Sequence, residues 1–285
     1  TTCLAKGPQG PPVESAEELL PMLRQLVSEE GELIIMSNYD GTLVPLALQT
    51  PTPVPPSIGA PRSRSQPLVA SPDPELADLL TRLSHQPHIH LYIASGRDRK
   101  EMEDWLGHLP IGLFAEHCYW ARGSGETEWE ARSDVSNEWK SKVLPVLHDF
   151  AAQTPGSFVE EKVASVGWHY RGCDMEFGSK QAKELRLFLL QSLSSLPLEV
   201  LQSNKLVEVR VHGISKALAV QRILAAYPDA KIVALGDERS DEDMFSAVNA
   251  TEGGVTINVG QQAFNRSTAA YRLRDVAHVR SFLRR

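Results

Sequence analysis

Residues 32–42 read Glu32-Leu33-Ile34-Ile35-Met36-Ser37-Asn38-Tyr39-Asp40-Gly41-Thr42, an apolar run that breaks into a polar loop. A short, uninterrupted apolar run is typical of a strand buried on both faces. The pattern recurs at residues 90–97, which end in Ser95-Gly96-Arg97, and at residues 231–243, which end in a cluster of acids. Three such strands separated by helices favour a parallel α/β sheet, whose functional residues meet at the carboxyl edge of the strands.

The middle of the chain has a different pattern. It predicts helices at residues 136–150 and 178–195, and closely spaced strands at 158–162, 163–171, 198–201 and 206–211. Such strands favour an antiparallel sheet with one face covered by helices. We therefore predict a Rossmann-like α/β core made of residues 1–118 and 212–285, with an α+β domain inserted at residues 119–211.

Four acids crowd the loop after the third strand: Asp237, Glu238, Asp241 and Glu242. Their mutual repulsion is costly unless a cation neutralises them, and a hard divalent ion such as Mg²⁺ prefers carboxylate oxygens. A solvated acidic loop is the alternative interpretation.

Two further positions are suited to binding an anion. Ser95-Gly96-Arg97 offers a hydroxyl and a turn just before a predicted helix, where backbone amides can hold a phosphate oxygen. Lys216 lies at the start of another predicted helix, where a cation is unfavourable against the helix dipole, so an anion ligand is favoured over a surface charge.

The composition and charge of the chain exclude several classes of binding partner. The formal net charge is −7 and the pI is about 5.7, so no positive field attracts nucleic acid. The apolar runs are too short to span a membrane. The 3 cysteines lack disulfide or zinc spacing and indicate reduced thiols in the cytoplasm. Residues 45–74 are rich in Pro and Ser and predict a long loop.

Together these clusters resemble the motifs of a known family. The chain resembles the trehalose-6-phosphate phosphatases of the haloacid dehalogenase superfamily through Asn38-Tyr39-Asp40-Gly41-Thr42-Leu43, Ser95-Gly96-Arg97-Asp98, Ser215-Lys216 and residues 236–243. The motifs above occur throughout the superfamily, and five further segments make the resemblance specific to this family: Glu103-Asp104-Trp105-Leu106-Gly107-His108, Ala115-Glu116-His117, Thr154-Pro155-Gly156-Ser157-Phe158, Trp168-His169-Tyr170-Arg171 and Glu176-Phe177-Gly178. The resemblance implies a haloacid-dehalogenase-like core with an inserted cap.

The resemblance also implies roles at the core. Position 38 is expected to hold an aspartate that attacks phosphorus, and here it holds Asn38. Asp40 is implied as general acid and base. The phosphoryl oxygens are implied to be held by Thr42, Ser95 and Lys216. The metal site is implied to consist of residue 38, the Asp40 carbonyl and Asp237, with Asp241 close by or reached through water. Glu238 replaces the family's usual second aspartate.

For the cap, the resemblance implies a surface that binds the sugar of trehalose 6-phosphate through Glu160, Lys162 and Glu208. Further substrate-binding candidates are Arg97, Glu116, His117 and Arg171. A synthase subunit or complex is implied as a partner.

Three functions stay open at this point. The first is a trehalose 6-phosphate phosphatase, and the second is a phosphatase for another sugar phosphate. The third is a silent module that binds a sugar phosphate or a synthase. Because every other site residue is present, we interpret Asn38 as an inactivating, substrate-trapping substitution.

Overall fold

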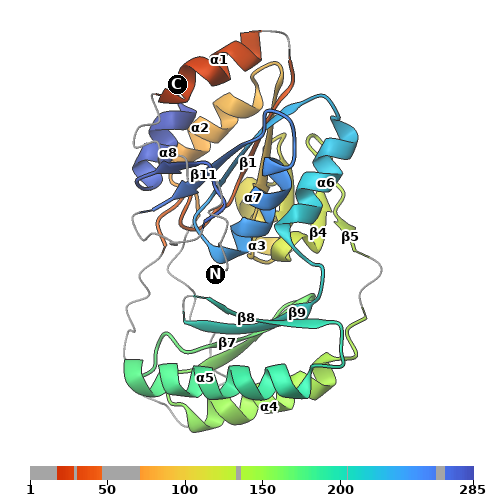
Figure 1. Ribbon diagram of the computed structural model, residues 1–285, viewed down its shortest axis with the longest axis vertical. Helices are drawn as coiled ribbons and strands as arrows, with labels where there is room; N and C mark the ends of the chain where they lie inside the picture. Colours follow the sequence, from red (N-terminus) through yellow and green to blue (C-terminus); the bar gives the residue numbers. More distant parts are fainter. Residues whose placement is uncertain (1–17, 29–30, 47–70, 133–135, 204, 261–266) are drawn as a thin grey trace, which may run out of the picture.

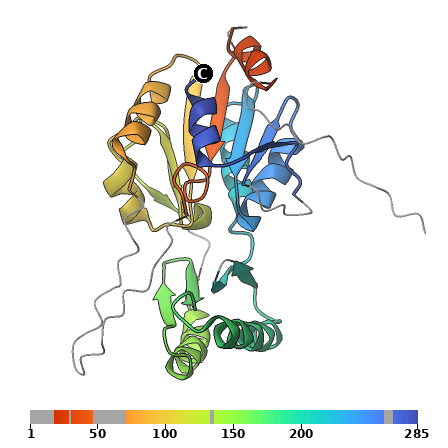
Figure 2. The same ribbon diagram turned by 90° about the vertical axis from the view of Figure 1, so that its left-hand side faces the viewer.

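The computed structural model describes residues 18–28, 31–46, 71–132, 136–203, 205–260 and 267–285. Most of the predicted Pro- and Ser-rich loop lies outside these ranges. The described residues form a larger sheet with helices on both faces and a smaller sheet with helices on one face (Figures 1 and 2). The predicted fold class, an α/β core with an α+β unit, is confirmed.

The larger sheet has the strand order β12-β11-β10-β1-β2-β3-β4-β5. Its strands are parallel from β12 to β3, and the last two are antiparallel. They are β1 (Leu33–Ser37), β2 (Ile89–Ala94), β3 (Gly112–Ala115), β4 (Trp120–Arg122), β5 (Glu130–Ala131), β10 (Lys231–Gly236), β11 (Val255–Val259) and β12 (Tyr271–Leu273).

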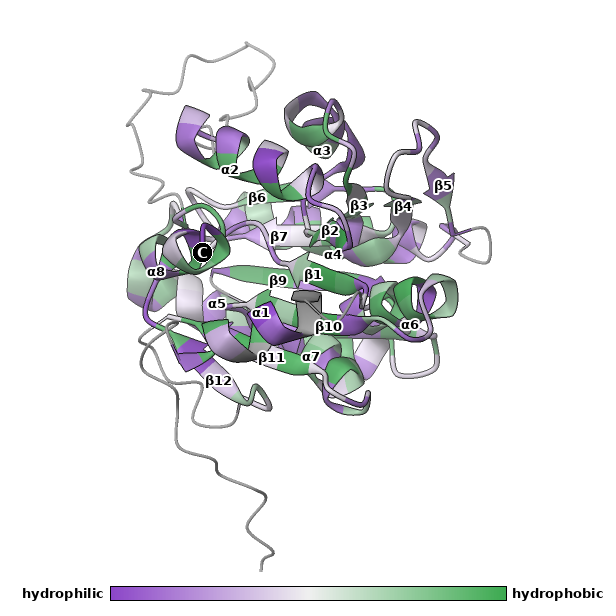
Figure 3. Ribbon diagram, turned by 90° about the horizontal axis from the view of Figure 1, so that it is seen from above, coloured by the Kyte–Doolittle hydropathy of each residue, from purple (hydrophilic) through white to green (hydrophobic). Residues whose placement is uncertain are grey.

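Helices cover both faces of this sheet. Along β1, Leu33 and Ile35 pack with α1, α2, α3 and α8, whereas Ile34 and Met36 pack with α6 and α7. Seen from above, β1 is hydrophobic between these two layers (Figure 3). The helices are α1 (Leu20–Ser28), α2 (Pro74–Ser84), α3 (Arg99–Leu106), α6 (Lys216–Ala226), α7 (Glu242–Asn249) and α8 (Val276–Leu283). Full burial of each such apolar side chain contributes about 1.5–3 kcal/mol, which is why β1 lies at the centre of the sheet.

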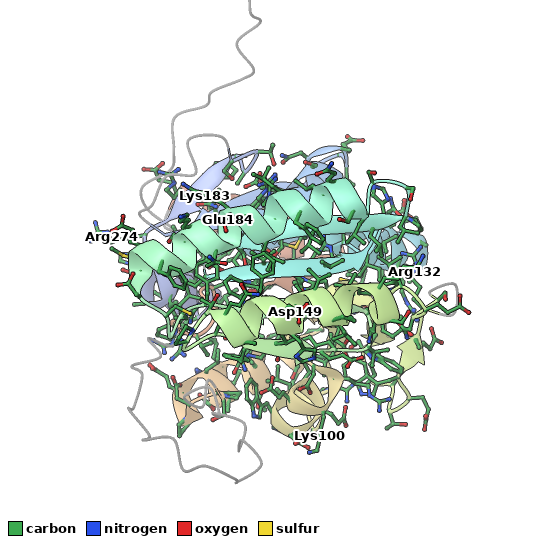
Figure 4. The ribbon with its side chains drawn as sticks, turned by 90° about the horizontal axis from the view of Figure 1, so that it is seen from below. Lys100, Arg132, Asp149, Lys183, Glu184 and Arg274 are labelled. Atoms are coloured by element: carbon green, nitrogen blue, oxygen red, sulfur yellow. The ribbon has the colours of Figure 1, made fainter. Side chains whose placement is uncertain are left out.

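The smaller sheet is antiparallel, with the order β6-β7-β9-β8. Its strands are β6 (Phe158–Glu161), β7 (Ser165–His169), β8 (Leu198–Ser203) and β9 (Leu206–Val211), and its helices are α4 (Lys140–Gln153) and α5 (Met175–Ser192). Val166, Trp168 and Val209 pack against these helices. Seen from below, α4 and α5 cover the sheet and carry Asp149, Lys183 and Glu184 (Figure 4). The other face of the sheet is directed at the larger domain (Figure 1).

One domain boundary differs from the prediction, which placed the start of the insertion at residue 119. Strands β4 and β5 pair in the larger sheet, with Phe114 opposite Ala121 and Ala121 opposite Glu130. They are short antiparallel strands that extend the sheet beyond β3. We therefore propose that the inserted domain begins after β5.

The parallel register brings the predicted motif loops to one edge. Ser37 at the end of β1 is paired with Leu235 on β10 and with Ile93 on β2. The loops that follow these strands therefore leave the sheet side by side. The loop after β2 leads into α3, where the Asp98 side chain caps the helix by accepting a bond from Glu101 N at 2.9 Å.

The turn after β1 requires glycine at position 41. Gly41 has a φ of 80°, and a Cβ there would lie 1.9 Å from Asp237 Oδ2. Gly125 offers a control, because its φ is 75° and a Cβ would meet nothing within 4 Å.

We predict that Gly41→Ala lowers the free energy of unfolding by at least about 1 kcal/mol more than Gly125→Ala does. Both substitutions have the backbone cost of a positive φ, about 1–2 kcal/mol, and only the first adds a collision. Urea denaturation of both variants measures the difference. Equal losses would contradict the close approach of the two loops.

Candidate active site at the carboxyl edge of the larger sheet

The side chain of Asn38 lies at the centre of the site and is only 3% exposed. Lys216 Nζ donates to Asn38 Oδ1 at 2.9 Å. Asn38 Nδ2 donates to the Asp40 carbonyl at 2.7 Å and to Asp237 Oδ1 at 2.8 Å. Because an ammonium only donates and a carbonyl only accepts, these partners determine which amide atom is oxygen. The predicted motif residues 38, 40, 216 and 237 therefore meet in one network.

The carboxylate of Asp237 lies in a crowded, buried position. Thr42 Oγ1 donates to its Oδ1 at 2.7 Å. Burial, followed by the charge of nearby Asp241, raises the pKa of Asp237 to about 6, although the bonds from Thr42 and Asn38 oppose this rise. Burial likewise raises the pKa of Glu238 to about 8. These acids therefore favour a nearby positive charge.

Lys216 and Asp241 form a buried ion pair at 2.6 Å. Burial alone would lower the pKa of Lys216, but the Asp241 carboxylate raises it overall. The second oxygen of Asp241 accepts from the backbone amides of Asp237 and Glu238, each at 2.9 Å. Asp241 was expected among the metal ligands. Both of its oxygens accept from N–H donors, which connect Asp241 to Lys216 and to the loop after β10, and its expected place in the metal site stays a prediction.

Three oxygen-bearing groups still fit a hard cation: the side chain of residue 38, the Asp40 carbonyl and Asp237. In this chain the NH₂ group of Asn38 lies between the other two oxygens. An aspartate there would place a third acceptor against two acceptors, an arrangement that needs a cation. Among the described residues, no three His, Cys, Asp or Glu side chains form a metal-binding group.

Ser95 and Arg97 follow β2, as predicted. The Ser95 side chain is buried, and its Oγ accepts from Arg97 N at 3.1 Å. The guanidinium of Arg97 is directed at Asp40 and makes two bonds of 2.7 Å to its carboxylate. The contacts of the Arg97 guanidinium are with Asp40 and Glu101, and its expected role in substrate binding stays a prediction.

The smaller sheet places its acids on the face opposite its helices. Glu160 is paired with Gly167 across β6 and β7, and Gly167 with Glu208 across β7 and β9. Lys162 Nζ lies 3.4 Å from Glu160 Oε2 and donates to the carbonyl of Gly96 at 3.0 Å. The structure thus brings the three predicted cap residues together at the loop after β2.

His169 was not singled out from the sequence as a site residue. Its Nε2 lies 2.9 Å from Glu160 Oε2. Burial alone would raise the pKa of Glu160, but the bond to His169 and the charge of Lys162 lower it to about 2. Strand alternation places residues 165, 167 and 169 on one face, and this signal could have identified His169.

Glu116, His117 and Cys118 form a left-handed turn, with φ values of 48°, 55° and 78°. Each non-glycine residue in this region costs about 1–3 kcal/mol, and such strain clusters at functional sites. The turn contacts both domains, because Glu116 N donates to Arg97 O at 2.9 Å and Glu116 Oε2 accepts from Ala164 N at 3.1 Å.

His117 also contributes to this contact between the domains. Its Nε2 lies 3.5 Å from Glu208 Oε2, and its backbone amide donates to Ser95 O at 3.0 Å. Its Nδ1 is buried without a hydrogen-bond partner among the described residues. Arg171, by contrast, follows β7 at the opposite end from Ser165 and Lys162. The expected role of Arg171 in substrate binding stays a prediction.

The trehalose-phosphatase family model matches residues 61–277 of the chain. A similar protein is alpha,alpha-trehalose-phosphate synthase (UDP-forming) B of Dictyostelium discoideum, 38% identical over 216 residues that cover 75% of this chain and 25% of that protein. The trehalose-phosphatase of Saccharomyces cerevisiae is 31% identical over 255 residues, covering 81% of this chain and 26% of its own. The chain thus spans about a quarter of the length of these relatives.

Solved structures show the same similarity. The C-terminal domain of C. albicans trehalose-6-phosphate phosphatase superposes with a TM-score of 0.81 and 26% identity, covering 95% of this chain and 96% of that one. A haloacid dehalogenase-like hydrolase from Bacteroides thetaiotaomicron, 16% identical with a TM-score of 0.60, covers 89% of this chain and 98% of its own and shares the fold. The chain therefore belongs to the trehalose-phosphatase family and has a haloacid-dehalogenase-like α/β core.

Proposed function

We propose that this chain carries a Mg²⁺-dependent phosphatase site for trehalose 6-phosphate and that Asn38 holds the site inactive. The observation that carries the proposal is the position of the Asn38 amide between Lys216, the Asp40 carbonyl and Asp237. An aspartate in that position would present one oxygen to the ammonium and the other to the cation. The family match supports the phosphatase reaction, and the fungal relatives support the sugar phosphate.

With an aspartate at position 38, the reaction takes two steps. The carboxylate attacks phosphorus and forms an aspartyl-phosphate, while the Asp40 carboxyl donates a proton to the leaving sugar oxygen. Asp40 then accepts a proton from the water that cleaves the aspartyl-phosphate. Lys216, Thr42 and Ser95 hold the phosphoryl oxygens, and the lysine offsets their charge. The cation, when bound, supplies further charge neutralisation between residue 38, the Asp40 carbonyl and Asp237.

The smaller sheet supplies the sugar end of the site. Glu160, Lys162 and Glu208 face the larger domain, where carboxylates and an ammonium can hydrogen-bond several hydroxyl groups. Glu116 and His117 lie beside them, on the strained turn. We propose that these residues select the sugar and that closure of the inserted domain excludes water.

A silent binding module is the second candidate. The favouring observation is that the oxygen and the NH₂ group of the Asn38 amide both have partners, so the substituted site is not left with an unpaired polar group. A synthase subunit is the proposed partner, since one relative is named a bifunctional trehalose-6-phosphate synthase/phosphatase.

The described residues contain no helix with the length and apolarity needed to cross a membrane. Location in the cytoplasm stays a prediction.

Restoring the nucleophile is the first test. We predict that Asn38→Asp raises the rate of trehalose 6-phosphate hydrolysis by at least about 10³-fold. In the protease subtilisin, loss of the catalytic nucleophile lowers kcat by about 10⁶-fold. Phosphate release in the presence of Mg²⁺ measures the gain, and chelation should abolish it. The Asn249→Asp variant, altered on α7 outside the site, serves as the control and should stay inactive. Rates within tenfold for the unchanged chain and Asn38→Asp would contradict the role of position 38.

A substitution at Lys162 can distinguish sugar recognition from phosphoryl chemistry. In the Asn38→Asp background, we predict that Lys162→Ala lowers kcat/KM for trehalose 6-phosphate at least about tenfold, since each unpaired buried hydroxyl costs about 1–3 kcal/mol. p-Nitrophenyl phosphate, which lacks the sugar, should react nearly as before. Lys142→Ala is the control, because Lys142 is an exposed residue of α4. An equal loss for both substrates would show that Lys162 serves folding or the phosphate site.

A further inference from the structure

All three nitrogens of the Arg97 guanidinium have partners within the larger domain. Nε donates to Asp40 Oδ2 and Nη2 to Asp40 Oδ1, each at 2.7 Å. Nη1 donates to Glu101 Oε2 at 3.3 Å. The guanidinium also lies 4.7 Å from the ring centroid of Trp105, so one of its faces is covered. The side chain is 14% exposed, which leaves little of it available to a ligand.

This arrangement restricts the carboxylate of Asp40 in both position and plane. Two parallel N–H···O bonds define the orientation of a carboxylate. A single hydrogen bond, such as one from a lysine, leaves the carboxylate free to rotate. The arginine is itself held by Glu101 and Trp105, residues of the rigid helix α3. Its backbone amide bonds to Ser95 and its carbonyl accepts from Glu116, so both ends of the residue are held.

We propose that Arg97 is a positioning residue that holds the side chain of Asp40 in one position and plane, and that it does not bind the sugar. The proposal rests on the proposed function, which gives Asp40 its role in proton transfer. Arg97 itself makes and breaks no bond in the reaction. Its role is geometric, and a displacement of about 1 Å in a reacting group can cost about 10²-fold in rate.

Binding to the unchanged chain is the first arm of the test. Because Asn38 prevents turnover in the proposed function, calorimetry can measure the Kd for trehalose 6-phosphate directly. The Arg97→Lys substitution keeps the positive charge but loses the two parallel hydrogen bonds to Asp40. We expect it to change this Kd by less than about threefold. Arg99→Lys is the matched control, since Arg99 is an exposed residue of α3 that stacks on Trp120 at 4.4 Å. A Kd at least tenfold weaker for Arg97→Lys alone would identify Arg97 as a sugar ligand and overturn the proposal.

A double-mutant cycle in the Asn38→Asp background is the second arm. We expect Arg97→Lys to lower kcat by about 10- to 100-fold with KM changed less than about threefold. When Asp40→Asn is already present, the same substitution should cost less than about twofold, because no general acid is left to orient.

Equal losses with and without Asp40→Asn, or a loss confined to KM, would overturn the role of Arg97. An Asn38→Asp variant with no turnover would instead contradict the proposed function, and the binding arm would still decide whether Arg97 contacts the sugar.

Discussion

The contacts of the Asn38 amide connect three separate parts of the chain. The loop after β1 supplies the amide and the Asp40 carbonyl, the start of α6 supplies Lys216, and the loop after β10 supplies Asp237. A charged hydrogen bond of this kind contributes about 1.5–3 kcal/mol, and an unpaired buried partner costs about as much. The close approach of Gly41 to Asp237 and the buried Lys216–Asp241 pair lie at this junction, where we also propose the cation to bind.

The left-handed turn at residues 116–118 connects this junction to the residues that we propose bind the sugar. It bonds on one side to the carbonyls of Ser95 and Arg97, and on the other to Ala164 and Glu208. The turn therefore contacts both the smaller sheet and the loop that carries Ser95. In physical terms, the strain of the turn is offset by the two sets of contacts that it makes.

Sequence patterns predicted the central strands well, because strands such as β1 and β10 are buried on both faces and read as apolar runs. They did not predict that β4 and β5 belong to the larger sheet, since strands of 3 and 2 residues carry too little periodicity. Motifs identified the residues that meet around Asn38. The pairing of Arg97 with Asp40 and the occupied oxygens of Asp241 depend on side-chain directions between distant segments, which spacing alone does not specify.

In the proposed function, an aspartate at position 38 shares a cation with the Asp40 carbonyl and Asp237. Calorimetric titration of Mg²⁺ into the unchanged chain and into Asn38→Asp, without substrate, tests this most directly. We predict that the variant binds Mg²⁺ at least about tenfold more tightly, a gain of about 1.4 kcal/mol, because an acceptor oxygen replaces the NH₂ group. Equal affinities for the two forms would contradict a shared cation at position 38.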